Sequence, residues 1–108
     1  MAAVRVCGVD DLAVNEASRF VVDGVPIAVV KDAAGDVFAI GDTCTHGDIS
    51  LAEGFVEDDT LECWAHGSMF SLKTGKPLTL PAYEPVPVYR VQIEGGDVLI
   101  DPAVTLTV

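Results

Sequence analysis

The chain has 108 residues and a mass of 11.3 kDa, a size that fits one compact domain. Half of its residues are apolar and only 21% are charged, which argues against intrinsic disorder. The 17 Asp and Glu residues outnumber the 6 Lys and Arg residues and give a net charge of −11. Because an acidic surface repels phosphate groups, the charge argues against nucleic acids and membrane surfaces as partners.

The N-terminal residues 1–8 contain no apolar segment behind a basic start, and no window reaches the roughly 18 apolar residues of a membrane span. Three cysteines do not indicate a disulfide-rich secreted domain. We therefore expect a protein of the reducing cytoplasm, where thiols stay free or bind metal. Cys7 is expected to be a small buried strand residue.

Apart from a short helix expected over 10–18, the pattern predicts short strands separated by turn residues. The expected strands cover residues 19–22, 26–31, 36–41, 60–64, 69–72, 86–94 and 98–101. Asp23-Gly24 between the first two strands is a strong hairpin turn. In the last hairpin the apolar residues should face the core and the polar ones solvent: Val91, Ile93 and 98–100 inward, Arg90 and Gln92 outward. Turns every 8–12 residues favour an all-β fold, a small antiparallel sandwich or barrel.

Two short segments hold both histidines and two of the three cysteines. Cys44-Thr45-His46 is followed, after sixteen intervening residues, by Cys63-Trp64-Ala65-His66. Two thiolates and two imidazoles are four ligands, enough for one closed metal site.

Three interpretations compete for these four side chains. A structural zinc site uses the same ligands, but C-x-H is an unusual opening for one. A disulfide between Cys44 and Cys63 would leave both histidines unexplained. The third is a [2Fe–2S] cluster in which two histidines replace two cysteines on one iron, and the spacing favours it.

The run CTHGDISLAEGF, followed by LECWAHGSMFSLKTGKPL, resembles the small soluble Rieske ferredoxins of bacteria, over about residues 27–101. The resemblance implies a single Rieske domain over 1–108, with a cluster-binding subdomain formed by two loops, at about 43–82, on a basal β portion. It also implies that Cys44 and Cys63 hold a buried inner iron of one [2Fe–2S] cluster, and that His46 and His66 hold the outer iron.

Several neighbouring residues are expected to surround the cluster in such a protein. Gly47 and Gly67 would let the backbone approach it closely. The resemblance places Pro81 in a third loop that covers it, although an ordinary turn proline is the alternative. Trp64, between two ligands, is either a core residue or a docking residue for a partner.

Comparison with respiratory Rieske proteins predicts a low reduction potential. Those proteins carry a cysteine in each loop, where this chain has Ile49 and Ala65, so the disulfide between the loops is absent. They also place a serine and a tyrosine beside the cluster sulfurs; this chain keeps Ser68 but has Phe70 at the tyrosine position. Because hydrogen bonds to sulfur raise the potential, we expect the lower half of the range of about −150 to +300 mV. Alternatively, Ser68 caps the loop without touching sulfur.

The predicted function is a one-electron carrier between a flavoprotein reductase and a terminal oxygenase or similar acceptor, through transient contacts. No histidine is left for a mononuclear iron site and no dinucleotide-binding glycine motif follows a strand, so catalysis by this chain is not expected. The segment 32–72 holds nine Asp or Glu residues and no Lys or Arg, and it would steer basic partners. Two alternatives are an accessory subunit of an iron–sulfur assembly or nitrite-reductase-like complex, and a zinc-stabilised binding module.

Overall fold

The computed structural model describes residues 3–43, 49–57, 59–64, 67–78 and 85–105. Within these ranges the chain forms nine strands and two short 3₁₀ turns, η1 (Val9–Asp11) and η2 (Leu51–Glu53). The strands are β1 (Val4–Gly8), β2 (Glu16–Val22), β3 (Val25–Lys31), β4 (Val37–Gly41), β5 (Phe55–Glu57), β6 (Thr60–Glu62), β7 (Met69–Ser71), β8 (Val88–Glu94) and β9 (Asp97–Thr105). The predicted all-β class is confirmed. No helix in the described ranges is long and apolar enough to cross a membrane.

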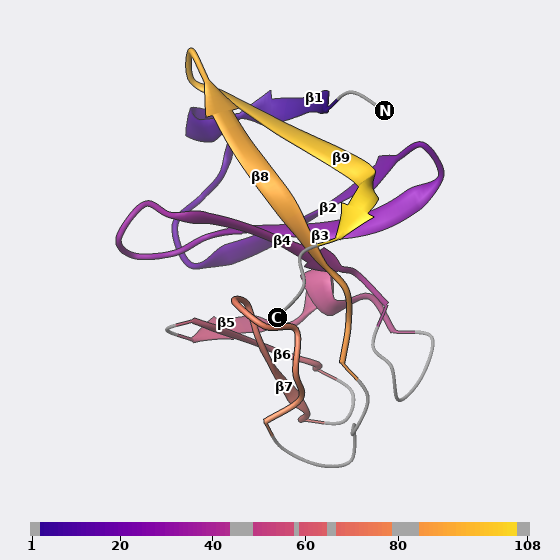
Figure 1. The fold of residues 1–108 in the computed structure, drawn as a ribbon. Coiled ribbons are helices and arrows are strands. Elements are labelled where there is room, and N and C mark those ends of the chain that lie inside the picture. The colour runs from indigo at the N-terminus through magenta and orange to yellow at the C-terminus, as the bar shows by residue number, and fades with distance from the viewer. Residues whose placement is uncertain (1–2, 44–48, 58, 65–66, 79–84, 106–108) are drawn as a thin grey trace.

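The strands form two antiparallel sheets. The larger has the order β1-β9-β8-β4-β3-β2, and its end strands β1 and β2 contact each other, so the sheet nearly closes into a barrel. The smaller has the order β5-β6-β7. In Figure 1 the smaller sheet lies at the bottom of the molecule, and the tip of the β8–β9 hairpin lies at the opposite end. This arrangement gives the molecule a larger barrel-like part and a smaller part built mainly from residues 49–78.

Strand β3 lies between two apolar cores, and this explains its continuous apolar sequence. Ile27 and Val29 face the core inside the large sheet, together with Val98 and Ile100 of β9. Ala28 and the other residues of the opposite face pack into a second core, between the two sheets. All four residues from 27 to 30 are completely buried. Because both faces are covered, apolar and polar residues do not alternate along this strand.

The hairpin turn predicted at Asp23-Gly24 is confirmed. Val22 pairs with Val25, and the two residues between them have positive φ angles of 50° and 78°. Two consecutive positive φ angles define the type I′ turn, whose twist matches that of the flanking strands.

The helix predicted over 10–18 is wrong. Only the η1 turn forms there, and Asn15 has a φ of 61°, which a right-handed helix does not allow. The amide of Asn15 donates to the carbonyl of Lys31 (2.8 Å), and β2 begins at Glu16. Pairing with β3 therefore decides the conformation of this segment, against its local helical preference.

The inward position predicted for Ile93 is also wrong. Ile93 pairs with the buried Val98, but its own side chain is 50% exposed. It lies next to the Gly95-Gly96 turn, where the end of the hairpin projects beyond the core. Of the neighbouring predictions, Ile100 is buried and Arg90 is exposed as expected.

Two buried groups that titrate at alkaline pH, a thiol and a phenol, predict that the free energy of unfolding falls as the pH rises. Cys7 is a buried residue of β1, as expected, and Tyr89 is buried in β8. Burial raises the pKa of the Cys7 thiol, with a further contribution from the charge of Asp11, and burial raises the pKa of the Tyr89 phenol. Both groups lose protons more readily in the unfolded chain, so the stability they contribute declines as pH rises above their ordinary values of 9.0 and 10.0.

We expect the urea midpoint to fall less steeply above pH 9 in the double variant Cys7→Ala/Tyr89→Phe than in the unmodified protein. Between pH 6 and 7.5 the two curves should run parallel, because both groups stay protonated in the folded and in the unfolded chain. Equal slopes above pH 9 would show that other groups cause the decline.

Candidate metal centre

The second motif begins at the end of β6, where Cys63 is completely buried. Its amide donates to the carbonyl of Ser68 (2.7 Å), and its carbonyl accepts from the amide of Gly67 (2.8 Å). Gly67 has a φ of 74°, a conformation that glycine adopts without strain. The two hydrogen bonds close a tight turn between β6 and β7, and this turn fixes the position of Cys63.

The neighbours of Cys63 fall into a buried and an exposed set. Ser68 and Phe70 are completely buried, and Phe70 belongs to the same core cluster as Cys63. Trp64 is 51% exposed, so it is not a core residue, and the docking interpretation remains for it. The predicted influence of Ser68 and Phe70 on the reduction potential stays a prediction.

Residues of the first motif lie outside the described ranges, but those on either side of it are placed. The residues that the structure describes do not include Cys44, His46, Gly47, Ala65, His66 and Pro81. Thr43 and Ser50 form an isolated antiparallel bridge across the segment. Ile49 and Leu51 pack into the core cluster that contains Cys63. The residues on either side of the first motif therefore lie in or next to the core cluster that contains Cys63.

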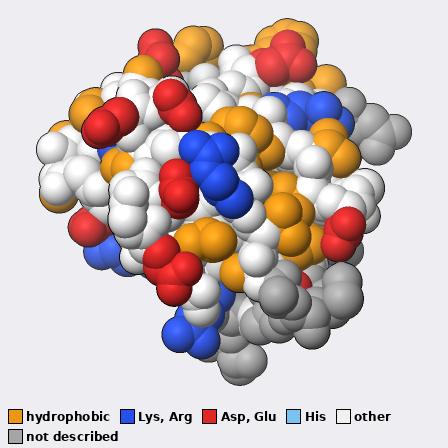
Figure 2. Space-filling model, turned by 90° about the horizontal axis from the view of Figure 1, so that it is seen from above, with side chains coloured by type: hydrophobic (Ala, Val, Ile, Leu, Met, Phe, Trp, Pro, Cys, Tyr) orange, Lys and Arg blue, Asp and Glu red, His pale blue; other side chains and the backbone are white. Residues whose placement is uncertain are grey.

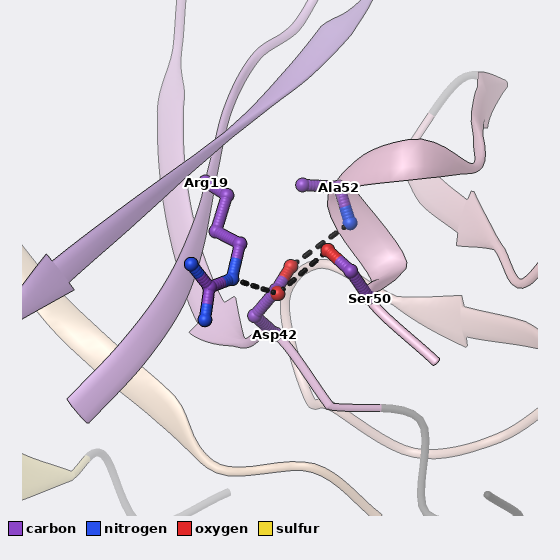
Figure 3. Close-up of polar contacts among 4 residues, drawn as sticks. All are labelled: Arg19, Asp42, Ser50 and Ala52. Atoms are coloured by element: carbon purple, nitrogen blue, oxygen red, sulfur yellow. Dashed lines mark hydrogen bonds and ion pairs between the residues drawn. The ribbon is translucent and has the colours of Figure 1, made fainter. Parts of the chain in front are cut away.

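Asp42, which the sequence analysis did not single out, joins the two ends of the first motif segment. Its carboxylate accepts hydrogen bonds from the Oγ of Ser50 (2.7 Å) and from the amide of Ala52 (2.9 Å). Its backbone carbonyl accepts from the amide of Leu51 (2.6 Å). Figure 3 shows the carboxylate between Ser50 and Ala52 on one side and Arg19 on the other.

The same carboxylate also contacts the large sheet. Nε of Arg19, in β2, donates to it at 3.0 Å, and the amide of Asp42 donates to the carbonyl of Pro26 at 3.2 Å. Asp42 is 2% exposed, whereas the Arg19 side chain is 52% exposed. A buried carboxylate needs such partners to offset its desolvation. The sequence holds one indication of this role for Asp42: it is an acidic residue that directly follows the apolar residues of β4.

The described part of the site fits a cluster of the expected kind. Cys63 offers a completely buried thiol in an apolar cluster, and two backbone hydrogen bonds hold its main chain in place. The donor set of two cysteines and two histidines is the one that a Rieske cluster requires.

An all-β domain whose sequence carries such a predicted donor set points to the class of metal- or cluster-binding proteins. The model of the Rieske [2Fe-2S] domain family matches residues 2–90. The chain therefore belongs to the Rieske [2Fe–2S] domain family, and the cofactor of that family is one [2Fe–2S] cluster. The predicted resemblance is confirmed, and membership in this family favours the iron–sulfur interpretation over zinc and over a disulfide.

Relatives of known name extend the comparison. The chain is 44% identical, over 94% of both chains, to the 3-phenylpropionate/cinnamic acid dioxygenase ferredoxin subunit of Escherichia coli K12. It superposes with a TM-score of 0.90 on the ferredoxin of carbazole 1,9a-dioxygenase from Nocardioides aromaticivorans, at 34% identity over 94% of this chain and 99% of that one. A complex of reduced oxygenase and oxidized ferredoxin in carbazole 1,9a-dioxygenase matches with a TM-score of 0.85, at 34% identity over 91% of both chains.

Proposed function

We propose that this chain is the ferredoxin component of a dioxygenase system and carries one electron at a time to a terminal oxygenase. The observation that carries the proposal is its 44% identity to a dioxygenase ferredoxin subunit along nearly the whole length of both chains. The complex of oxygenase and ferredoxin that matches this fold supports the terminal oxygenase as the acceptor. A flavoprotein reductase is proposed as the donor and the cytoplasm as the location.

The cluster would be held by Cys44 and Cys63 on one iron and by His46 and His66 on the other, and it supplies a site for one electron when bound. The chain's own residues hold and shield that site. The buried core around Cys63 excludes water, and the turn closed by Ser68 fixes the backbone of this ligand. The half-exposed Trp64, next to Cys63 in the chain, offers an apolar contact to a partner.

Metal analysis and reconstitution test the proposal. Anaerobically purified protein should contain iron and acid-labile sulfide in equal amounts, and the reduced protein should give an EPR spectrum of a Rieske cluster. Added to a reductase and a terminal oxygenase of a ring-hydroxylating system, it should support product formation that stops when it is omitted. Colourless protein that binds zinc would contradict the proposal. Stable co-purification with an iron–sulfur assembly or nitrite-reductase-like complex would favour the accessory-subunit alternative.

The acidic charge predicts a salt-dependent rate of electron transfer to the partner. Figure 2 shows that acidic side chains on the face above β1, β8 and β9 lie in separate spots, with fewer basic ones between them. With a net charge of −11, the protein should attract a basic partner surface over about 10 Å at 0.1 M salt. We expect the second-order rate to fall at least about threefold between 20 and 500 mM salt. A rate that does not change with salt would contradict steering.

Two charge reversals separate a local effect from the net charge. Glu62 directly precedes Cys63, whereas Glu94 lies at the distant end of the β8–β9 hairpin (Figure 1). Glu62→Lys and Glu94→Lys change the net charge equally. Glu62→Lys should slow electron transfer to the oxygenase more than Glu94→Lys does, because the partner docks near the cluster. Equal effects would show that the net charge alone matters.

A further inference from the structure

The buried carboxylate of Asp42 is the strongest polar feature near the candidate centre, and the electron-carrier function does not use it directly. Its side chain is 2% exposed and accepts from three donors in two parts of the chain, β2 and residues 50–52, while its backbone carbonyl accepts from a fourth. Surface ion pairs contribute little, but a buried carboxylate with several charge-assisted and neutral hydrogen bonds holds its surroundings in one arrangement.

The donors lie at positions that matter for the first motif. Asp42 precedes the segment that contains Cys44 and His46, and Ser50 and Ala52 follow it. A backbone hydrogen bond joins the same two ends of the segment, because the amide of Leu51 donates to the carbonyl of Asp42. One residue therefore joins both ends of the loop that supplies half of the predicted ligands.

The same contacts connect this loop to the rest of the protein. The carboxylate of Asp42 accepts from Arg19 in β2, and the amide of Asp42 donates to the carbonyl of Pro26 in β3. On the other side, Leu51 is completely buried in the core cluster that includes Cys63. Asp42 and the residues it binds thus hold both ends of the segment with the first ligand pair to β2, to β3 and to the core around Cys63.

We propose that Asp42 is a positioning residue for the cluster: its carboxylate closes the loop of Cys44 and His46 and fixes that loop against β2 and the core around Cys63. The inference rests on the proposed function and its ligands. It requires that weakening the closure changes how the protein holds the cluster, and not only how stably the chain folds.

Asp42→Asn keeps the shape of the side chain and removes its charge. We expect the holoprotein variant to lose iron to a strong chelator about tenfold faster than the unmodified protein, since changes in residues that orient metal ligands cost about 10- to 100-fold in affinity. Its EPR spectrum in the reduced state should broaden, because the ligand loop takes up several arrangements. Its midpoint potential should rise, because a negative charge near the added electron is removed.

The Arg5–Asp97 pair provides a matched control. Nε of Arg5 donates to Oδ1 of Asp97 at 2.9 Å, as Nε of Arg19 donates to Asp42, but the Asp97 carboxylate is 44% exposed and the pair joins β1 and β9 away from the loops. Asp97→Asn should leave iron loss, the EPR spectrum and the potential unchanged. If Asp42→Asn matches Asp97→Asn in these three measurements, the proposal is wrong, whatever the two variants do to thermal unfolding.

A milder pair of variants covers the case in which Asp42→Asn does not fold. Ser50→Ala removes one donor from the carboxylate, and Ser50→Thr keeps the hydroxyl. We expect iron loss to accelerate about threefold in Ser50→Ala and to return towards the original rate in Ser50→Thr. Equal rates in the two variants would overturn the proposal. Failure of the unmodified protein to bind a [2Fe–2S] cluster would overturn the proposed function instead, so the two failures are distinguishable.

Discussion

Cys63→Ala should remove most or all of the bound cluster. The substitution removes only the sulfur of a completely buried residue and keeps the hydrogen bond between its amide and the carbonyl of Ser68. Because loss of an orienting residue alone lowers metal affinity about 10- to 100-fold, loss of a ligand should cost more, and the iron per chain should fall by about tenfold or more. Iron and sulfide analysis, together with visible absorbance, measures the effect.

Cys7→Ala is the matched control for this variant. Cys7 is also a buried thiol, 6% exposed, but it lies in the core inside the large sheet rather than in the cluster that contains Cys63. The control should keep its iron and its colour. Circular dichroism of Cys63→Ala should show the strands still formed, so that loss of iron reports on the ligand. Full iron content in Cys63→Ala would show that this cysteine is not a ligand.

The strands that the sequence predicts best are those whose pattern depends on local residues. The β2–β3 hairpin follows from an Asp-Gly turn between two apolar runs, and it forms as expected. The strand β5 was not predicted, and of β1 only the strand position of Cys7 was expected, without bounds for the strand. β1 pairs with β9 at the far end of the chain, and β5 has only three residues and pairs with β6. Strands of this kind are stabilised by partners that the local sequence does not reveal.

In the candidate site, too, some residues can be predicted from the local sequence and others cannot. Four ligands at a characteristic spacing are visible in the sequence because each type of side chain is required by the metal chemistry. Asp42 is different, because Arg19 lies 23 residues before it and Ser50 lies eight after it. From the sequence alone, an aspartate at the end of a strand is interpreted as a turn residue. Only the fold shows that Arg19 and Ser50 lie within hydrogen-bond distance of it. The sequence therefore predicts four candidate ligands for the cluster but does not single out Asp42, the residue that we propose to position the loop of the first pair.

Gly54→Ala is the second change with a large expected effect. Gly54 directly precedes β5, and a Cβ atom at this position would overlap the carbonyl oxygen of Glu62 and lie 3.2 Å from that of Leu51. Both obstacles are backbone atoms, which cannot rotate away as a side chain can. Overpacking typically costs 1–3 kcal/mol and occasionally more, so we expect a loss of about 3 kcal/mol or more in the free energy of unfolding, measured with urea.

Gly35→Ala is the control that separates contact from backbone conformation. Gly35 has a φ of 90° and nothing within 4 Å of a Cβ atom, so alanine there costs only the strain of the left-handed region, about 1–2 kcal/mol. Gly54 has a φ of −88°, where alanine carries no such strain, so its cost comes from the contact with Glu62. Because Glu62 continues directly into Cys63, Gly54→Ala should also lower the iron content, whereas Gly35→Ala should not. If both variants lose the same stability and keep their iron, the close approach of β5 to β6 does not help to hold Cys63 in place for the cluster.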